Sequence, residues 1–204
     1  MNAENETEVT EFIDRIVKEV GSVDIVFNAI GPKASDYSNG TLAVHLSVDH
    51  YMVPLTTLVR SQFITAQAAA RVMLTQKSGV IIFVTGSPAR GHVPGATAIG
   101  TAFGAIETLM ENLAFELSPS GVRVVCLRTT ANTDSRTIRE SGKLMAEQMG
   151  MTEENVRQLL ASYNFLKTPA KVADTANAIA FLASDQARLL TATVVNSSAG
   201  AALD

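Results

Sequence analysis

Continuous apolar runs alternate with long amphipathic segments along this chain of 204 residues. Runs at 24–30, 80–84, 122–127 and 191–195 are predicted to be β-strands, and the lack of in–out alternation at 24–30 predicts a strand buried on both faces. The segments between them, of roughly 15 to 20 residues, are long enough for helical crossovers, which join parallel strands. The sequence therefore predicts the α/β class, with an open parallel sheet and helices on both of its faces.

The helices are predicted from apolar residues at helical spacing. They cover residues 9–20, 55–76, 96–117 and 168–184, and a further helix begins at Thr152. Gly21 is expected to end the first helix, and Pro169 is expected in the first position of the last, where a missing N–H costs no hydrogen bond. A turn is predicted at 38–40. No internal repeat or low-complexity linker interrupts the pattern, so one domain is expected over residues 1–204.

Composition excludes several classes of protein. Apolar residues make up 47% of the chain, enough for a core, so a disordered chain is excluded. The net charge is −4 and no basic run occurs, so no nucleic-acid interface is expected. Cys126 is the only cysteine, which excludes an intrachain disulfide and a cysteine-based zinc site. The polar, acidic start and the short uncharged runs predict no secretory signal and no membrane contact, and a cytoplasmic location is expected.

The first predicted strand poses a problem of pairing. Residues 24–30 are apolar enough for the centre of a sheet, yet no strand is predicted before them. An apolar strand left as a bare edge invites aggregation. Either a later strand covers it, or a partner chain does, or residues that belong upstream are missing.

Several short motifs, in this order and at this spacing, resemble the short-chain dehydrogenase/reductase family. They are Asn28-Ala29-Ile30-Gly31 after the first strand, similar to the family's Asn-Asn-Ala-Gly, then the segments 120–124 and 181–185, and 191–195 with Ala199-Gly200. The resemblance implies a seven-stranded parallel Rossmann sheet, of which this chain supplies the last four strands. Relative to the family, the domain at 1–204 is incomplete at its amino-terminal end.

The resemblance also implies a cofactor, NAD or NADP, and no metal. A family member begins with a strand, a Gly-rich turn and a helix whose amides hold the pyrophosphate, and no such turn occurs near residue 1. The residues that the resemblance places beside the cofactor are Asn28, Ala29, Ile30, Gly31, Thr85 and Gly86. For the first four, a structural role, in which Asn28 ties strand ends together and Gly31 turns the chain, has equal weight.

The catalytic residues of the family have no counterparts here. The tyrosine and lysine of Tyr-x-x-x-Lys fall on Ile99 and Phe103, the serine falls on Gly86 with Ser87 beside it, and the asparagine falls on Leu58. The family's chemistry needs a phenol of lowered pKa beside an ammonium group. Since Ile99 and Phe103 cannot transfer a proton, no catalytic residue is assigned and ordinary hydride transfer is not expected.

Other motifs are better explained by ordinary structural roles. The glycines at 86–93 have the spacing of a phosphate-binding loop, but His92 and Val93 replace the lysine and the hydroxyl residue, which favours a surface loop. His45, His50 and His92 lack the spacing of a metal site. Cys126 is expected to be a buried, inert thiol. The methionines at 145–151 are either part of a mobile substrate loop or a lid over the sheet edge.

Small residues on two helices suggest how copies of the chain associate. Residues 66–70 carry four alanines, and 100–104 carry Gly100, Thr101, Ala102 and Gly104. In the family these two helices form the subunit interface, so a homo-oligomer is expected through helices 55–76 and 96–117. Three functions stay open: a divergent family member without ordinary hydride transfer, an NAD(P)-dependent oxidoreductase acting on a small carbonyl or alcohol ligand with a relocated acid, and a non-catalytic scaffold or partner subunit.

Overall fold

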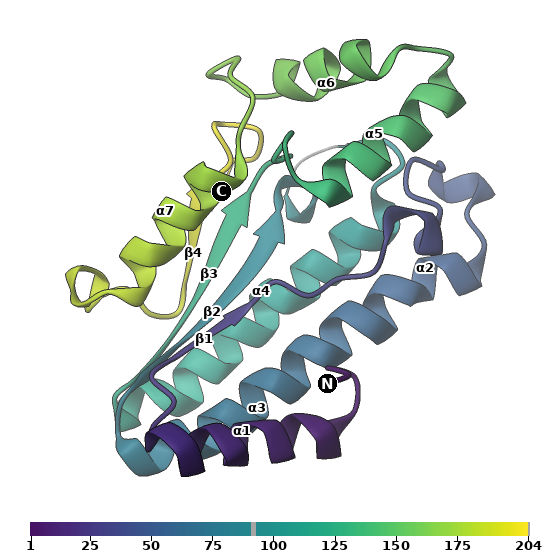
Figure 1. Ribbon diagram of the computed structural model, residues 1–204. Coiled ribbons are helices and arrows are strands. Elements are labelled where there is room, and N and C mark those ends of the chain that lie inside the picture. Colours follow the sequence, from purple (N-terminus) through teal and green to yellow (C-terminus); the bar gives the residue numbers. More distant parts are fainter. Residues whose placement is uncertain (91–92, 204) are drawn as a thin grey trace.

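A computed structural model describes residues 1–90 and 93–203, and its core is one four-stranded sheet. The strands are all parallel and lie side by side in chain order: β1 (Ile25–Asn28), β2 (Gly79–Gly86), β3 (Val122–Thr129) and β4 (Thr193–Ser197) (Figure 1). The α/β class, the parallel pairing and the four strands predicted from the sequence are confirmed.

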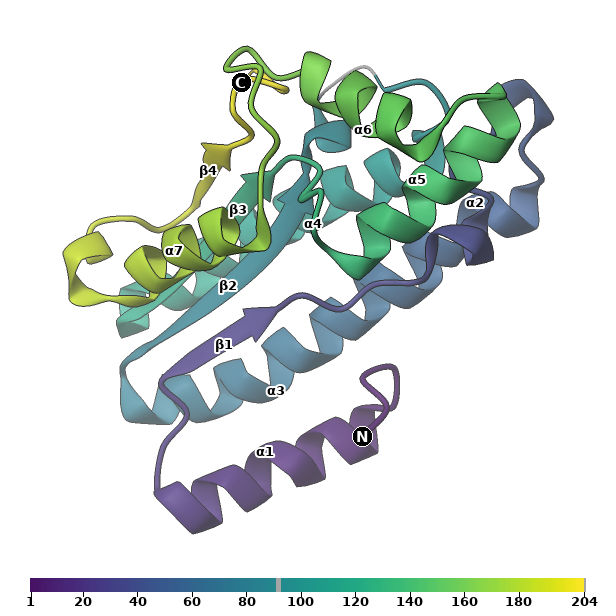
Figure 2. The same ribbon diagram turned by 45° about the horizontal axis from the view of Figure 1, so that its top comes forward.

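Helices cover the two faces of the sheet unequally. α1 (Glu6–Val20), α3 (Arg60–Gln76) and α4 (Thr97–Leu117) lie on one face, and α7 (Val172–Ala183) lies on the other (Figures 1 and 2). Each face of the sheet has its own hydrophobic core, and alternate residues of β2 pack into one or the other. Ile81 and Phe83 pack with the three helices, whereas Ile82 packs with Leu182 of α7. α5 (Arg136–Met149) and α6 (Glu153–Ser162) lie beyond the carboxyl ends of the strands.

The first helix forms as its sequence predicts. The Asn5 side chain caps α1 by accepting a hydrogen bond from the Glu8 amide, and Gly21, at φ 90°, ends it in the left-handed region. Val9 and Ile13 face the core, and the acidic residues face solvent. The acidic start of the chain is therefore a solvated helix face.

The second helical segment begins earlier than predicted. A short helix, α2 (Val48–Pro54), precedes α3, and a π turn at Leu55–Val59 joins the two. Ser47 caps α2 by accepting a hydrogen bond from the His50 amide. The prediction began the helix after Pro54, but here the wider π turn carries the chain past the proline, which lacks an N–H.

The last helix begins later than predicted, at Val172 and not at Pro169. Ala170 forms a bridge with Asn132, which keeps this stretch extended. The Asp174 side chain then accepts a hydrogen bond from the Lys171 amide and starts the helix. The helix that begins at Thr152 is confirmed as α6, which Thr152 caps; α5 was not predicted.

The prediction that strand 24–30 is buried on both faces is wrong. β1 is an edge strand and pairs only with β2 among the described strands, so no later strand covers it. Ile25 is 51% exposed and Phe27 is 45% exposed. Both lie on the face that carries α7, and α7 packs over β2 and β3 without reaching them. Along the described residues, no helix has the length and apolar character needed to cross a bilayer.

Candidate functional site

The candidate site lies where β2 and β3 end, against one face of α4. Ile99, Phe103 and Glu107 follow one another at intervals of four residues, which places them on the same face of that helix. Ile99 and Phe103 pack against the larger core cluster, and Glu107 is 2% exposed. The tyrosine and lysine positions implied by the resemblance are thus brought to the expected place, with apolar side chains in them.

Phe103 fills the space beside Gly86. A Cβ atom built on Gly86 would lie 2.9 Å from Cε2 of Phe103, closer than such atoms approach in proteins. The backbone of Gly86 is extended, at φ −124° and ψ 164°, so the tight contact and not the backbone conformation calls for glycine. The serine position and the lysine position are therefore occupied by two residues that fit each other.

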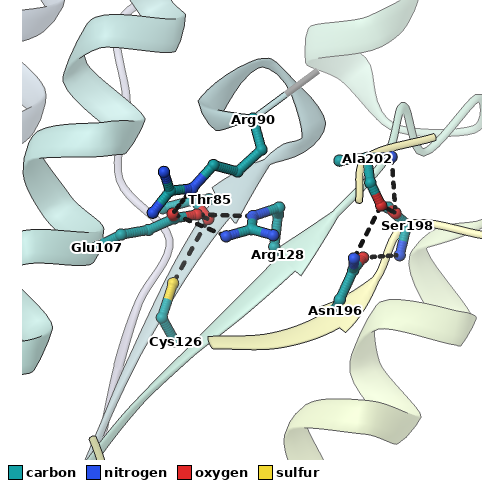
Figure 3. A network of polar contacts seen from close by, with 8 residues as sticks. All are labelled: Thr85, Arg90, Glu107, Cys126, Arg128, Asn196, Ser198 and Ala202. Atoms are coloured by element: carbon teal, nitrogen blue, oxygen red, sulfur yellow. Dashed lines mark hydrogen bonds and ion pairs between the residues drawn. The ribbon is translucent and has the colours of Figure 1, made fainter. Parts of the chain in front are cut away.

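A buried ion pair lies one turn further along α4 (Figure 3). Arg128 of β3 holds Glu107 in a fork: Nε donates to Oε1 and Nη2 donates to Oε2, each at 2.9 Å. The Thr85 hydroxyl of β2 donates to the same Oε1, also at 2.9 Å. Both charged side chains are 2% exposed. Such a fork fixes the carboxylate as an acceptor and joins three elements.

Two further groups complete this network (Figure 3). Arg90, which is 58% exposed, places Nε 3.6 Å from Oε2 of Glu107. The Cys126 sulfur lies 3.4 Å from the Thr85 hydroxyl, and burial raises the pKa of this thiol to about 12. The prediction that Cys126 is buried is confirmed.

The polar side chains at the end of β4 lie beside this network. Asn196, the register neighbour of Arg128, donates from Nδ2 to the Ala202 carbonyl at 2.9 Å. The Ser198 hydroxyl accepts from the Ala202 amide at 3.2 Å, so the two side chains close the terminal loop (Figure 3).

An open groove of about 630 Å³ runs between the segment after β2 and the first turns of α4. None of its described lining residues carries a titratable side chain, and Thr97 and Thr101 supply its hydroxyls. The Thr101 hydroxyl is already bonded to the Thr97 carbonyl. The groove offers a small ligand contact surface but no acid or base. Its lining residues are Pro88, Ala89, Val93, Pro94, Ala96, Thr97, Gly100, Thr101 and Gly104.

At the end of β1, the Asn28 side chain bonds to a helix and not to another strand end. Its Oδ1 accepts a hydrogen bond from the Thr65 hydroxyl, which ties the strand to α3. Its Nδ2 has no partner among the described residues, although Asn28 is only 1% exposed. Gly31 lies against Leu58, the asparagine position, which is buried in the core.

The structure brings the six cofactor positions to one edge of the sheet. Residues 28–31 follow β1, and Thr85 and Gly86 end the neighbouring strand β2. Parallel strands end at the same edge, where ligands of open α/β sheets bind. The Thr85 hydroxyl donates a hydrogen bond to Glu107, and Phe103 covers Gly86.

The segment after β3 is tied down by hydroxyl and amide groups. Thr129 and Thr130 stand where the family has Pro-Gly, and the Thr130 hydroxyl donates to Oδ1 of Asn164 at 3.2 Å. Asn164 donates in turn to the Thr168 carbonyl at 2.8 Å. These contacts fasten the chain that follows α6 to the end of the sheet.

Two predictions about ligands touch residues 91–92, which lie outside the described part of the chain. The phosphate-loop spacing at 86–93 includes them, and so does His92. In the described part, no three His, Cys, Asp or Glu side chains come together to hold a metal ion.

Sequence reasoning missed Glu107 and Arg128. Glu107 lies between Ile106 and Met110 on the core face of α4, and Arg128 is the second of two arginines in the otherwise largely apolar strand β3. A buried charge requires a partner of opposite sign, so the opposite charges on the inward positions of these two segments were the available signal.

The residues at the reactive end do not fit the family's usual chemistry. A nicotinamide dinucleotide would supply the hydride, but a proton-transfer group must stand beside the reacting oxygen. The positions that would provide it hold Ile99 and Phe103, and Phe103 is packed against Gly86. No step of hydride transfer is derived from this arrangement.

Comparison with known proteins supports the fold and the order of motifs. The family described as Enoyl-(Acyl carrier protein) reductase matches residues 1–202. Short chain aldehyde dehydrogenase 1 of Euphorbia lathyris is 30% identical over 194 residues, which cover 90% of this chain and 63% of that protein. The chain thus spans less than two thirds of the length of this relative.

Solved structures share the same architecture. NAD+-bound xylitol dehydrogenase matches with a TM-score of 0.86 at 22% identity, over 96% of this chain and 75% of its own. ElxO with NADP bound matches with a TM-score of 0.85 at 17% identity, over 98% of this chain and 76% of its own. From the family match, the motif order and the parallel sheet together, the chain belongs to the short-chain dehydrogenase/reductase family.

Proposed function

We propose that this chain is a short-chain dehydrogenase/reductase that does not carry out ordinary hydride transfer. The observation that carries the proposal is the Phe103 ring, seated against Gly86 where the family has lysine and serine. With Ile99 in the tyrosine position, no side chain there exchanges a proton with a substrate oxygen.

Neighbouring polar groups do not replace the missing pair. Glu107 is the buried carboxylate at this place, and both of its oxygens accept hydrogen bonds from Arg128. Tyr37 is a buried phenol, but burial and the nearby Asp36 raise its pKa to about 12, opposite to the shift that a proton donor needs. These observations disfavour the alternative of an oxidoreductase with a relocated acid.

Binding of NAD or NADP is a separate part of the proposal. Family membership supports a nucleotide cofactor, and the proposed contacts are the residues at the ends of β1 and β2, namely Asn28, Ala29, Ile30, Gly31, Thr85 and Gly86. Asn28 contributes an amide nitrogen without a partner among the described residues.

Turnover and binding are to be measured separately. The chain is assayed with NADH and with NADPH over a panel of small aldehydes and ketones, and cofactor binding is titrated by nicotinamide fluorescence. We expect no rate above the enzyme-free background, whether or not the cofactor binds. A rate well above background would contradict the proposal.

A variant assay identifies the acid if a rate appears. Glu107→Gln removes the one buried carboxylate of the site, and Glu140→Gln is an exposed control on α5. Turnover that Glu107→Gln abolishes while circular dichroism shows the variant folded, and that Glu140→Gln leaves intact, would establish the relocated-acid alternative instead.

A second candidate function is that of a non-catalytic partner subunit. The exposed apolar edge of β1 favours it, because Ile25 and Phe27 are half exposed on a strand that pairs on one side only among the described strands.

A further inference from the structure

A cavity of about 330 Å³ lies between α6 and the chain that follows it. α6 supplies one wall, and the chain that returns toward α7 supplies the other through Lys167 and Pro169 (Figure 1). A cavity of this volume is large enough for a small molecule. None of its described lining residues belongs to β2, β3 or α4, so it is separate from the candidate site.

Each of the two walls of this cavity carries a cation. Arg157 comes from α6, and Lys167 comes from the returning chain. Arg157 forms an ion pair with Glu154 through Nη2, and Lys167 Nζ donates to the Ser162 carbonyl at 2.6 Å. A guanidinium group has five N–H donors and an ammonium group has three, so these contacts leave donors on both cations for a ligand.

The charge of the cavity lining is positive, although Glu154 is part of it. Glu154 Oε1 accepts a hydrogen bond from Nε2 of Gln158 at 3.1 Å, and Oε2 pairs with Arg157. Glu154 therefore holds Arg157 in place at the cavity. Two cations and one carboxylate give the described lining a net charge of +1, in a chain whose net charge is −4. A lining with this charge is balanced by one monoanionic group.

The backbone of Lys167 is strained, and the residues around it hold it in that conformation. Its φ is 53°, in the left-handed region that glycine and asparagine adopt more easily. The Lys167 amide donates to the Asn164 carbonyl at 3.1 Å, and Asn164 Nδ2 donates to the Thr168 carbonyl at 2.8 Å. A glycine would fit this turn without strain, so the backbone does not account for a lysine here. Strained residues of this kind gather at sites that clamp ligands.

We propose that this cavity binds a small carboxylic acid in its anionic form. The ligand carboxylate lies between Arg157 and Lys167 and accepts hydrogen bonds from both, and the planar fork of the arginine suits a carboxylate. Ala161 and Pro169 supply apolar contacts for the carbon chain of the ligand. A dianionic phosphate fits less well, because Glu154 lines the same cavity and repels the second negative charge.

A purely structural role for Lys167 is the alternative explanation. A cation near the carboxyl end of a helix interacts favourably with the helix dipole, and Lys167 already bonds to Ser162 in the last turn of α6. That role accounts for Lys167 but not for Arg157 on the opposite wall, and it predicts no ligand. The proposal is independent of whether the chain transfers hydride, because no residue of the candidate site takes part in it.

The test is an NMR titration of the isotope-labelled, full 204-residue chain with acetate, butyrate and inorganic phosphate at constant ionic strength and about pH 8. We expect saturable shifts confined to residues 154–169. Butyrate should bind more tightly than acetate, because it adds contacts with Ala161 and Pro169, and phosphate should bind more weakly than butyrate. Glu154→Gln should shift this preference toward phosphate, since it removes the charge that opposes a dianion.

Substitutions at the two cations locate the binding. Lys167→Asn should weaken butyrate binding by about fivefold or more, since it removes one cation and introduces a residue that tolerates the left-handed backbone. Arg157→Gln should have the same effect without altering the strained turn. An amide spectrum that matches the wild type outside residues 154–169 shows that each variant is folded.

The matched control is Lys143→Gln on α5, an exposed position that loses the same charge and should leave binding unchanged. The absence of saturable shifts at residues 154–169 overturns the proposal. So does tighter binding of phosphate than of butyrate by the wild type, or an equal loss of butyrate binding in Lys143→Gln and Lys167→Asn.

Discussion

At the scale of single residues, the site is defined by the close packing of the large Phe103 ring against Gly86, which has no side chain. Gly86 has an extended backbone that any residue adopts, yet the ring of Phe103 occupies the volume of its Cβ. The ring of Phe103 requires glycine at position 86, and the glycine leaves the space that the ring fills. The family's serine and lysine positions are therefore filled here by two residues that pack as a unit.

Adding a methyl group at Gly86 tests this fit. Gly86→Ala should lower the free energy of unfolding by about 1–3 kcal/mol, because the new Cβ meets the Phe103 ring at 2.9 Å. Gly86→Ala with Phe103→Leu should recover part of the loss. Urea denaturation followed by circular dichroism measures both.

Gly104→Ala is the matched control, since no atom lies within 4 Å of a Cβ at that helical position. It should stabilise α4 by about 0.5–1 kcal/mol. Equal effects of the two alanine substitutions would contradict the steric explanation.

Cys126 gives the unfolding free energy a distinct dependence on pH. Burial raises its pKa from 9.0 to about 12, so the folded state keeps the proton that the unfolded state loses. This contribution is fully present below pH 9 and is lost as the pH rises toward 12. Between pH 8 and pH 10 the wild type should lose about 1.4 kcal/mol more than Cys126→Ala does.

The comparison uses slopes and not absolute stabilities, because Cys126→Ala also removes a buried contact with Thr85. Urea unfolding of both proteins at the two pH values gives the slopes. Since Tyr37 and the other alkaline groups are present in both proteins, their contributions cancel. Parallel slopes would show that the thiol titrates normally in the folded state.

At the scale of elements, Glu107 and Arg128 connect α4 to β3, and Thr85 adds β2. An ion pair with both members buried contributes little net stability, but removal of one member leaves a buried charge without its counterpart. The pair therefore fixes how the helix sits on the strand ends more than it raises overall stability.

Glu107→Gln should lower the free energy of unfolding by about 3 kcal/mol, since Arg128 loses its carboxylate partner. The double variant Glu107→Leu/Arg128→Met should recover most of that loss. Urea denaturation gives the values. As a control, Glu140→Gln breaks the exposed pair with Arg136 and should change stability by less than about 0.5 kcal/mol. A double variant less stable than Glu107→Gln would refute this account.

Elements were predictable from sequence where the signal is local. The helix at α1 has its cap and its terminal glycine in the sequence, and α6 has Thr152. The starts of α2 and α7 were misplaced because they depend on a π turn around Pro54 and on the bridge between Asn132 and Ala170. The Ser47 cap is local to the start of α2, whereas the bridge of Asn132 with Ala170 joins distant segments and is not visible in the residues next to α7.

At the scale of the whole molecule, the features of the site that depend on local sequence could be predicted, and those that join distant segments could not. The replacement of the family's tyrosine and lysine could be predicted from the sequence, because the four-residue spacing along α4 places Ile99 and Phe103 on one face. Two other features could not be predicted, because each joins segments far apart in the sequence. They are the contact of Phe103 with Gly86 and the Glu107–Arg128 pair. The exposure of β1 could not be read from its apolar composition, which is the same for an edge strand and a central one.

Self-association is a prediction at this scale. The alanines at 66, 68, 69 and 70 of α3 pack inside the molecule's own core, so they are not available to a partner. The exposed large apolar residues of α3 and α4 in the described chain are Phe63, Leu74 and Phe115, which are 42%, 40% and 85% exposed. We expect a homo-oligomer by light scattering at micromolar concentration, which Phe115→Lys weakens and Leu189→Lys does not. A clean monomer for the wild type would disprove it.

The Glu107–Arg128 pair also bears on the history of the chain. Neither position can mutate alone without a stability penalty, so an intermediate ancestor with one charge would be selected against. Descendants should therefore change both codons together or neither.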